Sequence, residues 1–289
     1  MPASINNINH IIDIIPSILL KFKLSLPCCY HNESPRDARH HPKRQSPDKQ
    51  SPDKRGPDKR GWLMAIVTFG SSKGGSGKST LCVNIGVARK LAGSDLLLVD
   101  ADPQQSLTQW SALREANQVE PYLENVQRVG EGFGKSVLEV SRRYDTTLID
   151  VAGHNSDELR AALNISNLVV LPLRPSNFDA WVFASDLRLL EQARIYNPGL
   201  VALVCFNGLS FAPAVRAREV RDMSEVLASY TGFQVAQAGV GQRAAFNRSV
   251  ALGRAVLEMP EDTTPSGERA RNEIITLYRD IFTRLGEST

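Results

Sequence analysis

Cysteine is scarce in this chain, with four in 289 residues, and none of the spacings suits a metal site. Cys28 and Cys29 are adjacent, while Cys82 and Cys205 stand in apolar runs. A zinc ribbon or an iron–sulfur cluster would need cysteines paired at characteristic intervals. The pattern therefore argues against both and favours reduced thiols in a cytoplasmic protein.

Long apolar runs are also missing. The stretch IIDIIPSILLKF, residues 11–22, contains Asp13 and Pro16 and is too short to span a bilayer. No Lys or Arg precedes it, and no small-residue cleavage site follows it. We therefore expect neither a membrane span nor a secretory leader in this region.

Charge is unevenly distributed along the chain. The formal net charge is +3, but residues 1–62 hold 11 Lys and Arg against 6 Asp and Glu, and the remainder holds 23 against 25. The basic character thus belongs to the first segment. Bulk charge gives no reason to expect nucleic-acid binding by the rest of the chain.

Residues 1–63 are predicted to be a disordered tail, because a Pro-Asp-Lys unit recurs at Pro47, Pro52 and Pro57 in a stretch with little to bury. Met64 stands immediately before the first predicted strand. We expect the natural protein to begin there, with residues 1–63 as translated upstream sequence. The alternative is a basic arm that binds DNA or anionic lipid.

A glycine-rich stretch, FGSSKGGSGKST, runs from Phe69 to Thr80. Apolar residues before it predict a buried strand, and those after it recur at helical spacing. Such a turn aims backbone N–H groups and the positive end of a helix at one point. Lys78 can then reach the β- and γ-phosphates of a nucleotide, and the Ser79 hydroxyl can bind Mg²⁺. The other residues predicted to surround the phosphates are Gly74, Gly75, Ser76, Gly77 and Thr80.

The stretch departs from the ordinary Walker A pattern, because Ser72 stands where that pattern has glycine. Residues 73–79, Lys-Gly-Gly-Ser-Gly-Lys-Ser, resemble the deviant Walker A motif of the ParA/MinD family of ATPases. In that family the first lysine reaches across a dimer interface to the partner's nucleotide. The resemblance implies that Lys78 serves its own ATP and Lys73 the neighbour's. Adjacent ammonium groups repel until polyphosphate neutralises them, which fits an ATP-gated homodimer.

Three aspartates follow runs that predict buried strands: Asp100 ends DLLLVD, Asp102 comes two residues later, and Asp150 ends TTLID. Open parallel sheets bind ligands at this end of their strands. An apolar run ending in an acid is the Walker B pattern, so Asp150 is predicted to hold Mg²⁺ together with Ser79 and Asp100. The string Asp-x-Asp-Pro-Gln resembles the ParA switch segment, which implies that Asp102 positions the attacking water.

Further strands over 168–173 and 200–207 alternate with predicted helices, the clearest over 178–194. This alternation predicts an α/β fold, a doubly wound and mainly parallel sheet with helices on both faces. The Val-Ala-Gly after Asp150 and a Pro-Ser-x-x-Asp segment at 175–179 resemble the small plasmid-type ParA proteins represented by ParF. Asn207 is predicted to contact the adenine edge, with an ordinary turn asparagine as the alternative. His154 is expected to be a structural hydrogen-bonding group.

The last segment, residues 271–289, has apolar residues at helical spacing. MinD proteins end in a membrane-binding amphipathic helix. Here Glu273, Asp280 and Glu287 dilute the basic face, so a packed core helix is expected and membrane association is not.

One stretch is a candidate for DNA binding. No acid occurs between Glu225 and Glu258, yet Arg243, Arg248 and Arg254 do. Arginines that contact the phosphate backbone bind DNA without reading its sequence. The alternative is a solvated helix face.

The resemblance covers residues 64 to about 286, and it implies a partition ATPase of the ParF type over 64–289. Such a protein binds ATP and Mg²⁺, forms a homodimer, hydrolyses ATP slowly and binds DNA non-specifically. A ParB/ParG-like centromere-binding protein would stimulate it, and it would be cytoplasmic and nucleoid-associated when ATP-bound. The rival readings are a MinD-type positioning ATPase at a membrane or cell pole and an ATP-dependent metabolic ligase on the same fold.

Overall fold

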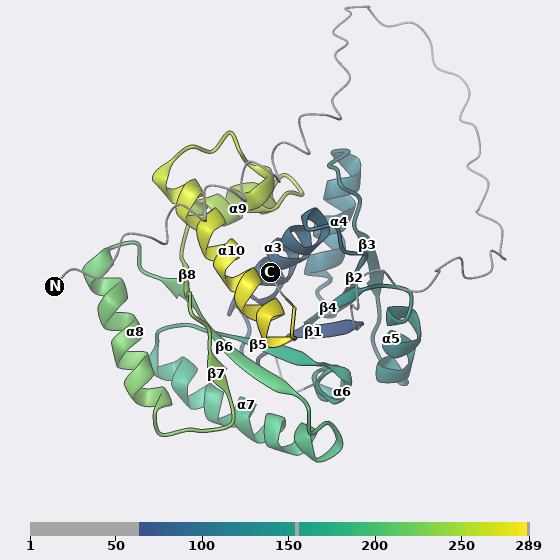
Figure 1. Cartoon of the computed structure of the whole chain (residues 1–289), viewed down its shortest axis with the longest axis horizontal. Coiled ribbons are helices and arrows are strands. Elements are labelled where there is room, and N and C mark those ends of the chain that lie inside the picture. Colours follow the sequence, from purple (N-terminus) through teal and green to yellow (C-terminus); the bar gives the residue numbers. More distant parts are fainter. Residues whose placement is uncertain (1–63, 154–155, 288–289) are drawn as a thin grey trace, which may run out of the picture. The chain divides into compact units, whose positions relative to one another are not determined.

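The computed structural model describes residues 64–153 and 156–287 (Figure 1). The predicted disordered tail, residues 1–63, and His154 lie outside the described residues. The domain boundary predicted at Met64 therefore stays a prediction.

A single parallel sheet runs through the described part of the chain, in the order β3-β2-β4-β1-β5-β6-β7, with β8 paired to β6. The predicted doubly wound α/β fold is confirmed, as are the five strands expected from apolar runs. The short β3, β7 and β8 were not predicted, because they are too brief or too polar to give a strand pattern. The strands are β1 (Ala65–Phe69), β2 (Leu96–Ala101), β3 (Glu124–Gln127), β4 (Thr146–Val151), β5 (Leu168–Leu173), β6 (Val201–Leu209), β7 (Gln234–Val235) and β8 (Val240–Gly241).

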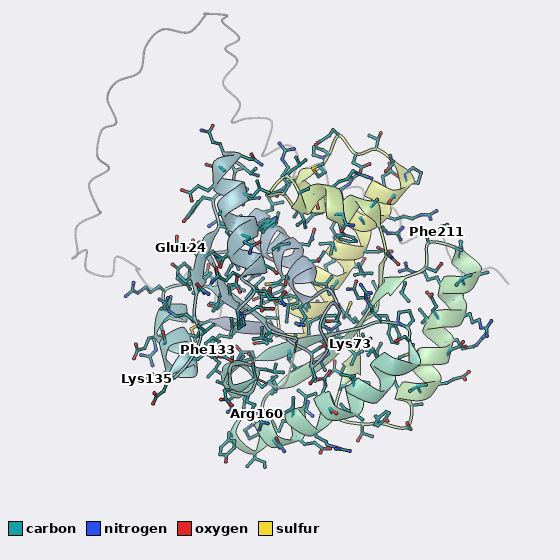
Figure 2. All side chains as sticks on the ribbon, turned by 180° about the vertical axis from the view of Figure 1, so that it is seen from behind. Lys73, Glu124, Phe133, Lys135, Arg160 and Phe211 are labelled. Atoms are coloured by element: carbon teal, nitrogen blue, oxygen red, sulfur yellow. The ribbon has the colours of Figure 1, made fainter. Side chains whose placement is uncertain are left out.

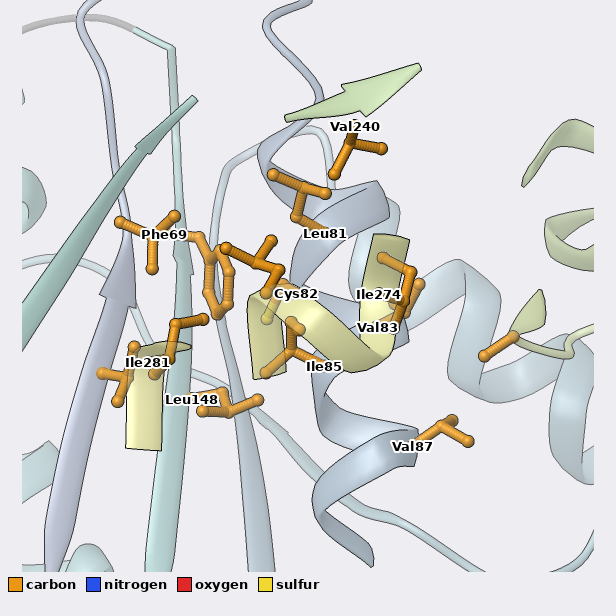
Figure 3. Close-up of a cluster of buried hydrophobic side chains, with 14 of the residues drawn as sticks. Phe69, Leu81, Cys82, Val83, Ile85, Val87, Leu148, Val240, Ile274 and Ile281 are labelled. Carbon is orange, nitrogen blue, oxygen red and sulfur yellow. The ribbon is translucent and has the colours of Figure 1, made fainter. Parts of the chain in front are cut away.

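Helices cover both faces of this sheet (Figure 1). One apolar core joins the sheet to α5 (Phe133–Ser141), α6 (Asp157–Ile165), α7 (Asn177–Tyr196) and α8 (Pro213–Leu227). A second core joins the opposite face to α3 (Lys78–Leu91), α4 (Ser106–Ala116), α9 (Ala244–Val250), the short η1 (Val256–Glu258) and α10 (Pro265–Arg284). Figure 3 shows part of this second core, where α3 and α10 side chains meet around Phe69 and Leu148. Strands buried on both faces explain the unbroken apolar runs in the sequence.

The C-terminal helix α10 is a core helix, as expected. Ile274, Leu277 and Ile281 are fully buried against the sheet and α3. No helix in residues 64–153 and 156–287 combines the length and the apolarity needed to cross a bilayer.

The three acids that dilute the basic face of this last segment all have partners. Glu287 binds the buried Arg89 of α3 through two hydrogen bonds, of 2.7 and 2.9 Å. The Arg89 side chain is 1% exposed and also donates to Thr146, at 2.8 Å. Because loss of one partner would leave a buried charge, breaking this pair would cost about 3–5 kcal/mol of stability. Asp280 pairs with Arg284, and Glu273 is described below.

Candidate functional site

Strand register brings the predicted site together at one edge of the sheet. Phe69 pairs with Asp150 across β1 and β4, and Asp150 pairs with Asp100 across β4 and β2. The phosphate loop follows Phe69 directly. Three segments that are far apart in sequence therefore start or end side by side, at the carboxyl end of the parallel strands, where such sheets bind ligands.

The phosphate loop leads straight into α3, whose first residue is Lys78. Gly75 and Gly77 have φ values of +71° and +96°, which only glycine adopts without strain. Lys78 is 6% exposed and donates from Nζ to the Lys73 carbonyl oxygen at 3.0 Å. Burial lowers the pKa of Lys78, while the charges of Asp150, Asp102 and Asp186 act to raise it. The Lys78 ammonium is therefore largely buried and is held against the backbone of the phosphate loop.

Gly153, three residues after Asp150, rests against the phosphate loop. A Cβ at this position would lie 2.6 Å from the Cα and 2.7 Å from the backbone nitrogen of Gly74. Backbone cannot move aside as a flexible side chain can, so residue 153 must be glycine for this contact. The Val-Ala-Gly sequence after Asp150 thus packs directly on the loop.

Asn207 reaches the loop from the end of β6. Its amide nitrogen donates to the Ser76 carbonyl oxygen at 2.6 Å, and a Cβ on Gly77 would lie 2.1 Å from the same nitrogen. The side chain therefore holds the loop in place. The predicted contact with the adenine edge stays a prediction.

Asp150 is a buried carboxylate that lacks hydrogen-bond partners. Its exposure is 0%, and neither oxygen has a hydrogen bond of good geometry, although the Ser79 hydroxyl lies near enough to act on the carboxylate as a donor. Burial raises its pKa to about 7, with Asp100 adding to the rise and the nearby Ser79 and Lys78 opposing it. Unpartnered buried carboxylate oxygens are costly in a folded protein and suit a cation that completes their coordination.

The arrangement suits a magnesium ion that the protein binds only in part, rather than a metal ion held entirely by protein side chains. Within the described ranges, no group of three or more His, Cys, Asp or Glu is arranged so that it could hold a metal ion by itself. Mg²⁺ usually takes one or two protein oxygens together with water and substrate phosphates. Asp150 and Ser79, next to the phosphate loop, provide that kind of partial site.

Asp100 and Asp102 organise the turn between β2 and α4. The Asp100 carboxylate accepts from the backbone nitrogens of Asp102, at 3.1 Å, and Thr108, at 2.7 Å. Asp102 accepts from the Gln104 nitrogen at 2.9 Å and lines the cleft above the loop. Asp100 thus ties the strand to the first turn of the helix, while Asp102 faces the cleft where a nucleophilic water would be placed.

A cleft of about 610 Å³ lies over the phosphate loop. Gly74, Gly75 and residues 77–80 of the loop form one wall, and the Asp102 turn, Gly153 and Arg174 form others. Trp110 and Val250 extend the cleft toward α4 and α9. Arg174 and Trp110 were not expected from the sequence, since neither stands in a recognisable motif.

Asp186 of α7 is a further residue that the sequence did not reveal. It is 6% exposed and accepts from the backbone nitrogen of Ser72 at 2.7 Å and from the Ser72 hydroxyl. The serine that replaces the usual glycine is thereby fixed to a helix from the other half of the chain. The sequence showed only an acid among apolar residues of a predicted helix. That pattern does not indicate that Asp186 would bind Ser72.

The helix after the Asp102 turn is joined firmly to the segment after α9. Arg114 of α4 pairs with Glu258 through hydrogen bonds of 2.6 and 2.8 Å, and the two side chains are 4% and 6% exposed. A Cβ on Gly253 would lie 2.5 Å from the Arg114 backbone nitrogen. The Trp110 indole donates to the Arg254 carbonyl oxygen at 3.3 Å.

The same segment also contacts the helix that follows the phosphate loop. Asn84 of α3 is fully buried and accepts from the Val256 nitrogen at 3.0 Å. Its amide nitrogen donates to the Thr80 carbonyl oxygen at 2.7 Å. Residues 253–258 are therefore held by both helices that border the nucleotide cleft.

Arg243 is not a free surface cation. Its side chain is 6% exposed and binds Glu273 of α10, with an Nε contact of 2.8 Å. Glu273 also binds Arg216 at 2.9 Å. The sequence has no acid between Glu225 and Glu258. In the folded chain, however, Glu273 from α10 lies next to Arg243. Arg243 is thus committed to packing α9 against α10.

Arg248 and Arg254 are more accessible, and they too have acidic partners. Arg248 contacts Asp262 at 2.5 Å, and Arg254 contacts Glu261 at 3.2 Å. The two arginine side chains are 48% and 39% exposed. The sequence suggested that Arg248 and Arg254 carry positive charge without nearby acids. The fold corrects this, because Asp262 and Glu261, in the loop before α10, pair with them.

Comparison with protein families matches residues 67–248 to the CobQ/CobB/MinD/ParA nucleotide-binding domain. Protein ParA of Rhizobium radiobacter is 28% identical over 195 residues, which cover 66% of this chain and 84% of that protein. The maintenance of carboxysome distribution protein A of Halothiobacillus neapolitanus is 26% identical over 215 residues, covering 73% and 93%. The solved ATP complex of a Cyanothece McdA variant has a TM-score of 0.58 at 15% identity, covering 78% of this chain and 98% of that one.

Proposed function

Because this chain belongs to the CobQ/CobB/MinD/ParA family of nucleotide-binding domains, we propose that it is a DNA partition ATPase that dimerises on MgATP. The observation that carries the proposal is the buried, unpartnered Asp150 beside a phosphate loop with two lysines. Phosphoryl transfer needs positioned charge more than covalent chemistry, and this site provides positioned charge.

Nucleotide binding rests on the loop and the start of α3. Backbone N–H groups of residues 74–80 surround the phosphates, and Lys78 faces the β- and γ-phosphates. Ser79 and Asp150 hold the magnesium ion, which neutralises charge on the phosphates, and Asp100 supports them from the neighbouring strand. Asn207 keeps the loop in the shape that this requires and lies on the side proposed for the base.

Hydrolysis rests on Asp102 and Lys73. Asp102 lines the same cleft as the loop, and we assign it the orientation of the attacking water. Lys73 serves the nucleotide of a second subunit, so hydrolysis awaits dimer formation. This division of labour follows from the resemblance of residues 73–79 to the deviant Walker A motif, and it makes turnover slow and dependent on a partner.

DNA is the proposed cargo or track, and a ParB/ParG-like centromere-binding protein is the proposed stimulating partner. The relative in Rhizobium radiobacter carries the name ParA. We place non-specific DNA binding at Arg248 and Arg254, because these keep exposed guanidinium groups. Arg243 remains a structural member of that region. The ATP-bound protein would be nucleoid-associated in the cytoplasm.

A positioning ATPase is the second candidate, since one relative is named for carboxysome distribution. In that function the same switch would act at a membrane or cell pole.

Co-sedimentation of the full chain separates the two candidates. The protein is mixed with a random-sequence DNA duplex or with anionic vesicles, each with ATP, with ADP or without nucleotide. Partition predicts ATP-dependent sedimentation with DNA and none with vesicles. Sedimentation with vesicles alone would replace partition with positioning, and sedimentation with neither would contradict both surface-bound functions.

A further inference from the structure

Arg248 and Arg254, the exposed arginines of the proposed DNA surface, form ion pairs with an acidic loop. The loop spans Met259 to Thr264, between η1 and α10. Glu261 faces Arg254 and Asp262 faces Arg248, each within ion-pair distance. A phosphate group would have to displace these carboxylates, since a guanidinium binds either oxyanion in the same way.

The two pairs differ from the buried pairs around them. Arg243–Glu273 and Arg114–Glu258 have side chains no more than 11% exposed, and breaking them would strand a buried charge. Arg254 and Glu261 are 39% and 58% exposed, and Arg248 is 48% exposed, although its partner Asp262 is only 10% exposed. Ion pairs with an exposed guanidinium contribute little to stability, so a polyanion can replace the carboxylates on these arginines at little cost.

The loop itself is well anchored, so its acids stay in place. Arg271 of α10 donates to the carbonyl oxygens of Met259 and Asp262, both at 2.9 Å. The Asp262 carboxylate also accepts a hydrogen bond of 3.2 Å from the backbone nitrogen of Thr264, the residue that caps the start of α10. The Thr264 hydroxyl and the Arg248 guanidinium hold the pKa of Asp262 at about 2, so it carries charge at any physiological pH.

The arginine side of the contact is attached to the nucleotide cleft instead. The Arg254 carbonyl oxygen binds Trp110 of α4, and Gly253 packs on the α4 backbone at Arg114. The first turn of α4 is held in turn by Asp100, through Thr108. A shift of α4 when nucleotide binds would therefore pull on Arg254, while Asp262 stays bound to Arg271 of α10 and Arg248 stays on α9.

We propose that Glu261 and Asp262 form an autoinhibitory acidic mask, which competes with nucleic-acid phosphates for Arg248 and Arg254 and is displaced when α4 responds to ATP. The proposal rests on the DNA-binding function proposed above and specifies its regulation. It makes the ATP dependence of DNA binding a property of residues 248–262 in addition to dimer formation.

The test compares the full chain with its Glu261→Gln/Asp262→Asn variant. Asn keeps the oxygen that accepts from Thr264, so the start of α10 is preserved, and a thermal melt checks this. Fluorescence anisotropy with a random-sequence duplex gives affinity with and without ATP over a salt series. The variant should bind DNA about tenfold more tightly without ATP, with a smaller ATP effect. Two added phosphate contacts should steepen the slope of log affinity against log salt by about 1.8.

Two further variants test whether the effect is local. Asp222→Asn/Glu225→Gln removes the same charge from exposed positions on α8 and should change affinity much less. In an Arg248→Ala/Arg254→Ala background, the gain from Glu261→Gln/Asp262→Asn should vanish. A gain of equal size in the α8 variant, or one that survives without the arginines, would overturn the mask.

Failure of the mask and failure of the proposed function give different results. If the wild-type protein binds DNA with ATP and the unmasked variant binds no better, the mask alone is wrong. If neither protein binds DNA in any nucleotide state, the DNA-binding function is wrong and the mask with it. Should Asp262→Asn disturb folding, Glu261→Gln alone repeats the comparison, because Glu261 makes only an exposed ion pair with Arg254.

Discussion

Asp100 and Asp150 are register partners on neighbouring parallel strands, yet only Asp100 has hydrogen-bond partners. The Asp100 oxygens accept two backbone N–H groups from the turn that starts α4. The Asp150 oxygens accept none and are fully buried. One carboxylate thus shapes the turn, while the other keeps the unpartnered oxygens that the proposed magnesium site needs.

Asp150→Asn should remove a loss of stability that the wild type undergoes as pH rises. A pKa raised to about 7 means that folding favours the protonated acid. That contribution is complete below the ordinary pKa of 3.8 and is lost as pH rises through about 7. Without nucleotide or Mg²⁺, the variant should gain on the wild type between roughly pH 4 and pH 8, by at most about 4 kcal/mol. Urea unfolding across this range measures it, and parallel curves for the two proteins would contradict the raised pKa.

Lys78→Ala should abolish ATP binding, because it removes the ammonium that faces the β- and γ-phosphates. Isothermal titration with MgATP measures the loss. Lys90→Ala is the matched control, since Lys90 lies on the same helix and makes only an exposed ion pair with Asp95. Micromolar affinity retained in Lys78→Ala would show that the loop is not the phosphate site.

Lys73→Ala should leave ATP binding by the monomer nearly unchanged but abolish the ATP-dependent dimer and hydrolysis. Its charge is proposed to act on the nucleotide of the other subunit. Light scattering with MgATP reports the dimer. Lys135, which projects from α5 well away from Lys73 (Figure 2), gives a control variant of equal charge. A normal dimer and normal turnover in Lys73→Ala would exclude the cross-subunit role.

Asp102→Asn should trap the ATP-bound dimer. The amide keeps the oxygen that accepts from Gln104, so the turn survives, but it no longer orients water as a carboxylate does. Turnover should fall by about 100-fold or more, in the usual range for a positioned base, while ATP affinity holds. Asp95→Asn, at an exposed position beyond the site, should behave as wild type. Undiminished hydrolysis in Asp102→Asn would remove Asp102 from the mechanism.

Gly153→Ala should disrupt the phosphate loop. The added methyl would lie within 2.7 Å of Gly74 backbone atoms, and relieving such overlap costs about 1–3 kcal/mol. We expect ATP affinity to fall about tenfold or more. Gly134→Ala is the control, since its methyl would meet neighbours at 3.7 Å, an ordinary contact distance. Equal affinities in the two variants would mean that the loop tolerates movement at Gly74.

The sequence by itself determined five strands of the sheet, its helical cover and the glycine-rich loop at which we propose phosphate binding. Buried strands are continuous apolar runs, and the motif residues stand at fixed positions beside them, so local patterns were enough for Lys78, Asp100 and Asp150. The same patterns predicted α10 as a core helix. These features depend on residues that are close together in the chain.

Only the tertiary structure decided which charges are available. Arg243, Arg248 and Arg254 stand in a stretch without acids, yet Glu273, Asp262 and Glu261 reach them from farther along the chain. Asp186 and Arg114 likewise gained their roles from partners that no local pattern names. An ion pair depends on distance in space and on burial, and neither can be read from spacing along the chain.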